Sequence, residues 1–126
     1  ISYEWGEYLE RSRNGEHQVV MLGWTGDNGD PDNFLGTLLS CDAVKGGNNR
    51  AFWCNEEFSA LTTSAKQTTD IDARTEMYEQ AQVVFKQQAP WVPLAHSVVY
   101  QPMRDNVENF LMSPFGLNSF YGVSVK

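Results

Sequence analysis

The stretch that decides the architecture is GWTGDNGDPDNF, which spans residues Gly23 to Phe34. It follows a short apolar run and brings three carboxylates together, those of Asp27, Asp30 and Asp32. Acids this close together are typical of a metal loop, a helix start or a cation-binding site. Local rules assign two of the acids and leave the third open.

The second half of the stretch has the sequence of a helix start. Asp30 suits the N-cap position, because its side chain can accept a hydrogen bond from a free amide of the first turn. Pro31 suits the first helical position, where its missing N–H costs nothing. Asp32 complements the helix dipole in the first turn. These rules give Asp30 and Asp32 structural roles.

A metal or phosphate role for the same stretch is not favoured. An EF-hand calcium loop needs Gly at position 6 and Glu at position 12. A loop that begins at Asn28 has Asn33 and Leu39 there instead. An acidic loop would also repel phosphate, so we expect no metal and no cofactor.

The composition predicts a soluble globular domain with a core. The chain has 126 residues, of which 41% are hydrophobic and 20% charged, and a net charge of −7. This charge argues against nucleic acid as a partner, and no apolar run approaches the roughly 20 residues that span a bilayer. The chain opens at Ile1 without a start Met or a signal peptide. We therefore expect a processed product or a fragment.

Helix-like and strand-like stretches alternate along the chain, which predicts the α/β class. The Thr69–Asp72 pair resembles a capping box for the longest helix, and Asn55 suits the cap of the helix before it. Residues 101–126 have turns but no helical period, and we expect them to pack on something outside this chain. The expected elements are helices over 3–13, from about 31, after 55 and over 69–89, a strand over 17–24 that is buried on both faces, and a strand over 91–100 with Pro93 near its start.

Two cysteines, Cys41 and Cys54, lie in a segment rich in Gly and Asn. Two ligands without a neighbouring Cys or His make an incomplete zinc site. A disulfide is the favoured interpretation, and it implies an oxidising compartment. Two buried thiols are the alternative.

Asp27 remains as the candidate ligand contact. It follows a predicted strand, where α/β folds place their ligand sites. Gly26 and Gly29 flank it, and Trp24 precedes it as an apolar wall. A carboxylate there can pair with a ligand ammonium, and a solvated turn aspartate is the alternative. A hydrolase that uses Asp27 and a second acid lacks a partner base or nucleophile, so we expect no enzyme.

Four blocks together resemble a known family: YEWGEYL, then VVMLGWTGDNGDPDNF, then the paired cysteines, then MYEQAQVVFKQQAPWVPLAH. They are similar to the C-terminal part of the periplasmic dipeptide-binding proteins, within the peptide- and nickel-binding family of ABC-importer receptors. The resemblance implies a two-lobed Venus flytrap that captures dipeptides or short peptides for an importer. Residues 1–97 would belong to the C-terminal lobe, and residues 98–126 would cross back to the N-terminal lobe.

The resemblance also implies roles for individual residues. Asp27 would bind the α-ammonium group of a peptide with a free N-terminus, Trp5 would line a side-chain pocket, and Cys41 and Cys54 would form a disulfide. The backbone of Gly23, Trp24 and Thr25 would run beside the peptide as an added strand. The implied partners are the rest of the receptor and the membrane subunits of the importer, in the periplasm. A relative could carry oligopeptide, haem or nickel instead.

Overall fold

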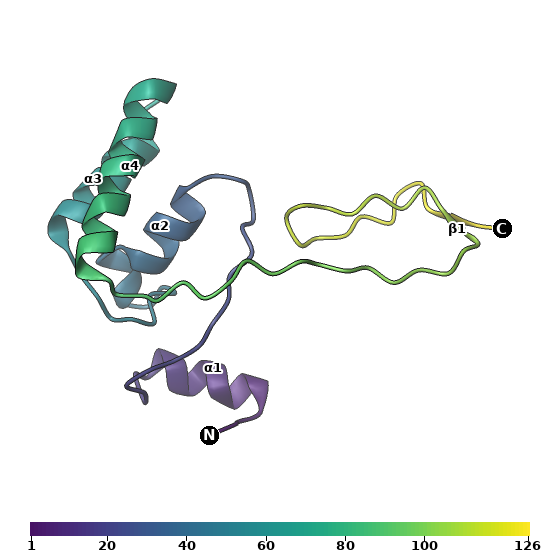
Figure 1. Ribbon diagram of the computed structural model, residues 1–126, viewed down its shortest axis with the longest axis horizontal. Helices are drawn as coiled ribbons and strands as arrows, with labels where there is room; N and C mark the ends of the chain where they lie inside the picture. The colour runs from purple at the N-terminus through teal and green to yellow at the C-terminus, as the bar shows by residue number, and fades with distance from the viewer.

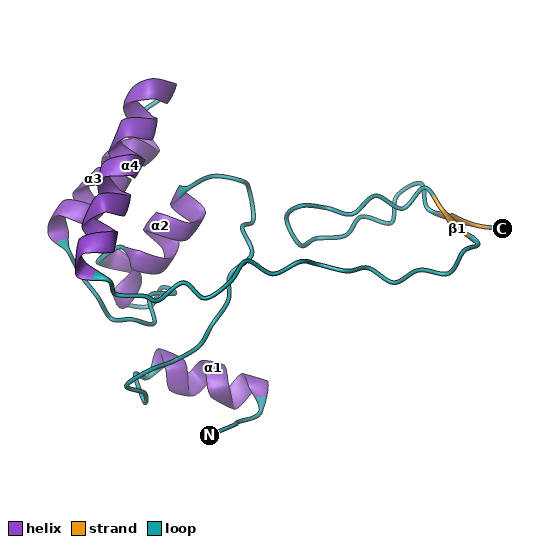
Figure 2. Ribbon diagram, viewed as in Figure 1, coloured by secondary structure: helices purple, strands orange, loops and turns teal.

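The computed structural model describes residues 1–126, the whole of the sequence. Figures 1 and 2 show α2, α3 and α4 gathered into one helical body, with α1 apart from it and a long arm that leaves α4 toward the C-terminus. No helix combines the length and the apolar character needed to cross a membrane. The elements in order are α1 (Trp5–Arg13), α2 (Asp32–Leu39), the 3₁₀ helix η1 (Asp42–Val44), α3 (Glu56–Gln67), α4 (Ile71–Gln88), β1 (Val107–Glu108) and β2 (Ser124–Val125).

Helix boundaries follow from capping side chains. Asn55 accepts a hydrogen bond from the Phe58 amide at 2.8 Å, so it caps α3 as predicted. At α4 the prediction of a Thr69–Asp72 box is wrong. Asp70 caps this helix instead, by accepting from the Ala73 amide at 2.8 Å. A short carboxylate directly before the first helical residue reaches that amide, which makes the box unnecessary.

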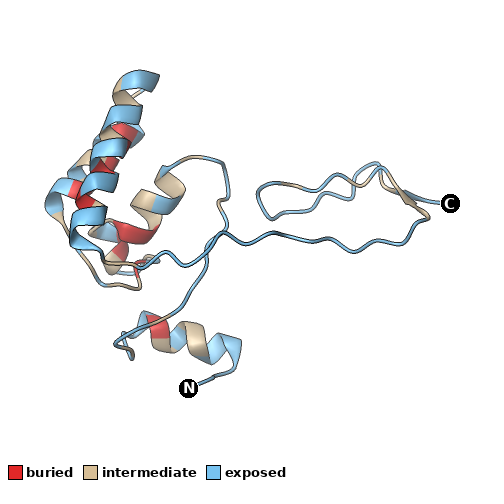
Figure 3. Ribbon diagram, viewed as in Figure 1, coloured by how far each residue is buried: buried red, intermediate tan, exposed pale blue.

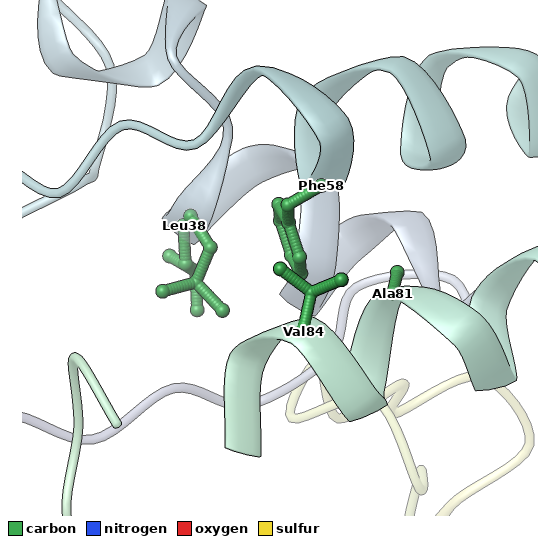
Figure 4. Close-up of a cluster of buried hydrophobic side chains, with 5 residues drawn as sticks. Leu38, Phe58, Ala81 and Val84 are labelled. Carbon is green, nitrogen blue, oxygen red and sulfur yellow. The ribbon is translucent and has the colours of Figure 1, made fainter. Parts of the chain in front are cut away.

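The core lies where α2, α3 and α4 meet. Figure 4 shows Phe58 of α3 between Leu38 of α2 and Val84 of α4, with Ala81 one turn away on α4. Phe58 and Ala81 are fully buried. The buried side of α4 consists of Tyr78, Ala81 and Val84, because residues three and four apart share one face of a helix. The core therefore holds α2 against α3 and α4.

The two predicted strands are absent. Residues 17–24 and 91–100 belong to no helix or strand, and the chain bends at Gln18 and Val19. A strand needs a hydrogen-bonded neighbour, and within this chain neither segment has one. Their apolar side chains are exposed as a result, as Val19 (90%) and Val92 (79%) illustrate.

Residues 101–126 form a long hairpin without a core of their own. β1 and β2 pair antiparallel, with Val107 opposite Val125, and a single bridge joins Leu111 to Ser119. Figure 3 shows this arm almost entirely exposed, and the Tyr121 side chain is 96% accessible. Poor burial of aromatic residues here agrees with the expectation from the sequence. Only 11 of the 126 residues are buried, so much apolar surface of the chain is uncovered.

Candidate ligand-binding site

The acidic loop, residues 23–34, runs from the segment 17–22 into the first turn of α2. Its three carboxylates have different partners. Asp30 accepts a hydrogen bond from the Asp32 amide, the first amide of α2, at 2.9 Å. The helix begins at Asp32, so Pro31 occupies the N-cap position that was predicted for Asp30 and lies one residue before the helix rather than at its first position. The second oxygen of Asp30 pairs with Arg74 of α4. Asp32 pairs with Lys66 of α3 at 2.9 Å. Two of the three acids therefore have structural roles, as the sequence predicts, and their ion pairs to α3 and α4, which it does not predict, hold the start of α2 against these helices.

The environment of Asp30 agrees with this structural role. The amide of Asp32 lowers the pKa of the Asp30 carboxyl, and the Arg74 guanidinium lowers it further. The pKa of Lys66 is raised by its hydrogen bond to Asp32. Each shift favours the charged form of the group. Both acids are therefore committed to partners inside the protein.

Asp27 has no cationic partner within the chain. It lies on the exposed surface of the acidic loop, and none of the ion pairs includes it. Its single side-chain contact is a hydrogen bond at 3.1 Å from Asn33 Nδ2 to Asp27 Oδ2. The other oxygen, Oδ1, has no hydrogen-bonding partner. Of the three acids, Asp27 alone remains available for a cation from outside.

Asn33, in the first turn of α2, is the residue that sequence reasoning missed. Its Oδ1 accepts from the Trp24 indole N–H at 2.7 Å and from the Asp27 amide at 3.1 Å. With the bond to the Asp27 carboxylate, one side chain connects three groups of the acidic loop. An asparagine at a helix start is so common that its letter gives no hint of this role.

The backbone before Asp27 is free of hydrogen bonds. Gly23, Trp24 and Thr25 belong to no helix or strand, and their main-chain N–H and C=O groups have no partner within the chain. The segment just before them is held by the Tyr8 hydroxyl, which donates to the Met21 carbonyl at 2.9 Å and accepts from its amide at 3.2 Å. An extended backbone with free polar groups can accept an added strand.

The tip of the C-terminal hairpin lies against the acidic loop. A Cβ built on Gly29 would come within 3.1 Å of the Phe115 ring, and one built on Gly116 within 3.3 Å of the Thr25 methyl group. Figure 1 shows this hairpin tip folded back toward the loop that precedes α2. Segments far apart in the sequence therefore meet beside Asp27.

Trp5 is not brought to the acidic loop. It lies on α1, 62% exposed, and its ring stacks on Tyr8 with the centroids 5.9 Å apart. α1 packs on no other helix or strand. The structure therefore joins Trp24 to Asp27 through Asn33 and leaves Trp5 separate.

Cys41 and Cys54 form the predicted disulfide. It closes the loop that follows α2, and no free cysteine remains. The buried Asn49 side chain crosses this loop, since its Nδ2 donates to the carbonyls of Ser40 at 3.2 Å and Trp53 at 2.8 Å. No cluster of three or more His, Cys, Asp or Glu side chains is arranged to hold a metal.

Comparisons with known proteins extend along the whole chain, although no protein-family model matches it. Di/tripeptide-binding protein 1 of Pseudomonas aeruginosa is 58% identical over 125 residues, which are 99% of this chain and 23% of that protein. Heme-binding protein A of Haemophilus influenzae is 46% identical over 125 residues, 99% of this chain and 23% of that protein. The chain therefore spans about a quarter of the length of these relatives.

Solved structures match the fold as closely. A dipeptide-binding protein from Pseudoalteromonas sp. SM9913, in complex with Met-Leu, superposes with a TM-score of 0.92 at 40% identity over 100% of this chain and 25% of its own. The ABC transporter-associated periplasmic binding protein DppA from Helicobacter pylori, in complex with the peptide STSA, gives 0.91 at 37% identity over 98% of this chain and 24% of its own. The extended segments and the protruding arm thus recur within larger proteins.

Proposed function

Since the chain is 58% identical to a di/tripeptide-binding protein of which it spans about a quarter, we propose that it belongs to the family of the dipeptide-binding proteins and forms part of the ligand site of a solute-binding receptor. This receptor captures dipeptides or short peptides in the periplasm and delivers them to the membrane subunits of an ABC importer. Its role is binding and release, without catalysis. The names of the similar proteins support this proposal, because they describe peptide-binding proteins and one transporter-associated periplasmic protein.

One observation carries the proposal to particular residues: Asp27 is the only acid of its loop without a cation. The carboxylates of Asp30 and Asp32 are paired with Arg74 and Lys66. Asp27 Oδ2 is oriented by Asn33 and Oδ1 is free. A peptide α-ammonium group has the charge and the donors to complete this arrangement. Asp27 therefore binds the free amino end of the ligand.

The remaining ligand contacts come from the backbone and from aromatic side chains. The unpaired main chain of Gly23, Trp24 and Thr25 supports a role in pairing with the peptide backbone, which is the same for every sequence. The exposed Trp5 lines a side-chain pocket once the receptor closes around its ligand. Fixing the ligand by its amino end and backbone lets its side chains vary.

The division of the chain between two lobes follows from the same proposal. Residues 1–97 belong to one lobe, and residues 98–126 cross to the other. The uncovered apolar surface of the extended segments and of the hairpin supports this division, because such surface needs a neighbour. The rest of the receptor supplies it, with strands beside 17–24 and 91–100.

Calorimetry with the whole receptor tests the peptide role. Met-Leu is expected to bind, and N-acetyl-Met-Leu to bind at least about 100-fold more weakly, because acetylation leaves the Asp27 carboxylate unpaired. Asp27→Ala should remove this discrimination, whereas the matched variant Asp32→Ala should keep it. Equal binding of the two peptides would refute the ammonium role, and turnover of either peptide would refute the absence of catalysis.

Haem is the second candidate ligand, because a relative that is 46% identical carries haem in its name. Haem has no α-ammonium group, so it would use Asp27 differently or not at all. Titration of the receptor with haemin, followed by the Soret absorbance, separates the two. Saturable haemin binding that Met-Leu does not displace would favour the haem candidate.

A further inference from the structure

The Asn33 side chain is placed so that it can act on the ligand site without touching the ligand. It is held in the first turn of α2, and its three hydrogen bonds go to Trp24, to the Asp27 amide and to the Asp27 carboxylate. None of these bonds is needed to build α2 itself. They orient the loop that precedes the helix.

The chemistry of the three partners forces one orientation of the Asn33 carboxamide. The Trp24 indole and the Asp27 amide are both donors, so they need the Oδ1 acceptor. The Asp27 carboxylate only accepts, so it needs the Nδ2 donor. A flipped amide would set donor against donor and oxygen against oxygen. All of these bonds are therefore made or lost together.

Asn33 can impose this geometry because its own helix is anchored. Asp30 pairs with Arg74 of α4, and Asp32 pairs with Lys66 of α3, directly before Asn33 in the chain. The core residue Leu38 holds the other end of α2. A side chain on an anchored helix transmits that rigidity to an otherwise exposed loop.

We propose that Asn33 is a positioning residue that presents the Asp27 carboxylate and the Trp24 ring to the peptide's amino end. This inference rests on the proposed peptide-binding function. With Oδ2 held by Asn33, Oδ1 of Asp27 is left to face the ammonium group. The ordering of the loop is complete before the ligand arrives, so binding does not have to supply it. Loss of Asn33 therefore weakens recognition of a free amino group more than it weakens the fold.

The test compares Asn33→Ala with Asn28→Ala in the whole receptor. Asn28 lies in the same loop, but its Oδ1 accepts from the Asp30 amide at 3.0 Å, and its side chain makes no hydrogen bond to Asp27 or Trp24. Affinities for Met-Leu and N-acetyl-Met-Leu are measured by calorimetry. Asn33→Ala is expected to weaken Met-Leu binding about 10- to 100-fold and to leave the acetylated peptide nearly unchanged. Asn28→Ala should alter neither.

A double-mutant cycle shows whether Asn33 acts through Asp27. In an Asp27→Ala background, Asn33→Ala is expected to cost less than about threefold in affinity, because the carboxylate that it orients is gone. Equal and additive losses for both peptides would overturn the proposal and leave Asn33 a purely structural residue. Asn33→Leu, which keeps the side-chain volume, provides the same comparison if alanine unfolds the loop.

The indole N–H of Trp24 gives a readout independent of affinity. Its ¹⁵N–¹H resonance, assigned through Trp24→Phe, should shift in Asn33→Ala and stay in place in Asn28→Ala. An unshifted resonance would overturn the positioning role. If wild-type receptor does not discriminate Met-Leu from its acetylated form, the proposed function fails and this inference fails with it. If it discriminates and Asn33→Ala does so equally well, only this inference fails.

Discussion

Arg74 on α4 holds the carboxylate of Asp30, 44 residues earlier in the chain, at the start of α2. The same guanidinium donates to the Ala65 carbonyl at the end of α3 at 3.2 Å, and it lies 5.1 Å from the centroid of the Tyr78 ring. Arg74 therefore joins the start of α2 and the end of α3 to α4. The position of the acidic loop depends on this contact.

Asp30→Ala is expected to lower the free energy of unfolding by about 1 kcal/mol, which is the typical cost of losing a helix cap. Asp27→Ala is the matched control, and it should change stability by less than about 0.5 kcal/mol because its side chain is exposed and makes no ion pair. Urea unfolding of the whole receptor, followed by circular dichroism, measures both. Equal destabilisation by the two variants would contradict the separate roles assigned to these acids.

The stabilising effect of Asp30 should depend on pH. Its pKa is lowered in the folded protein, first by the Asp32 amide and then by Arg74. A carboxyl with a lowered pKa stabilises the fold above its unfolded pKa, and this contribution is lost as the pH falls through the folded value. Asp30→Asn keeps an acceptor oxygen and removes the charge.

The difference in unfolding midpoint between wild type and Asp30→Asn should therefore be largest near neutral pH and shrink between about pH 5 and pH 2. Urea titrations at a series of pH values measure it. A difference that stays constant down to the acid limit would show that the charge of Asp30 does not contribute.

Local rules predicted the helical body well, because caps and apolar spacing act over only a few residues. Asn55 caps α3, and Asp30 accepts from the first amide of α2, through contacts two or three residues along the chain. The buried residues of α4, which are Tyr78, Ala81 and Val84, follow each other at helical spacing. Each of these features needs only its own sequence neighbourhood.

The strands could not be predicted in the same way, because a strand is a relation between two segments. Residues 17–24 and 91–100 have strand-like sequences, yet neither segment has a hydrogen-bonded neighbouring strand in this chain. The sequence predicts where a strand could form, but it does not predict which segment would pair with it. Asn33 was missed for a related reason, since its bonds to Trp24 and Asp27 depend on how the loop turns back onto α2.

Gly29 is expected to be intolerant of a side chain for two separable reasons. Its φ of +72° is unfavourable for other residues, and a Cβ there would meet the Phe115 ring at 3.1 Å. Gly122 has a φ of +83° with nothing within 4 Å. Gly122→Ala therefore measures the backbone cost alone, which is about 1 kcal/mol.

Gly29→Ala should destabilise the receptor more than Gly122→Ala, and combining it with Phe115→Ala should remove the excess. Thermal unfolding of the three variants and of Phe115→Ala measures this. Equal effects of the two glycine substitutions would mean that the hairpin tip does not press on the acidic loop.

Removing the disulfide should lower the stability of the fold and leave ligand binding at the acidic loop nearly unchanged. Cys41 and Cys54 are separated by 13 positions, and closing a loop of this size stabilises a protein by about 3 kcal/mol in the chain-entropy model. Asn49 also joins Ser40 to Trp53 across the same loop, so the loss should be at or below this value. The acidic loop lies at the opposite end of α2, anchored by Asp30 and Asp32. The Cys41→Ser/Cys54→Ser receptor should therefore show a lower urea midpoint and an affinity for Met-Leu within about threefold of wild type.

Dithiothreitol should shift the wild-type midpoint and leave that of the double variant unchanged. An affinity that falls in parallel with stability would show that the disulfide loop and the acidic loop are coupled through α2.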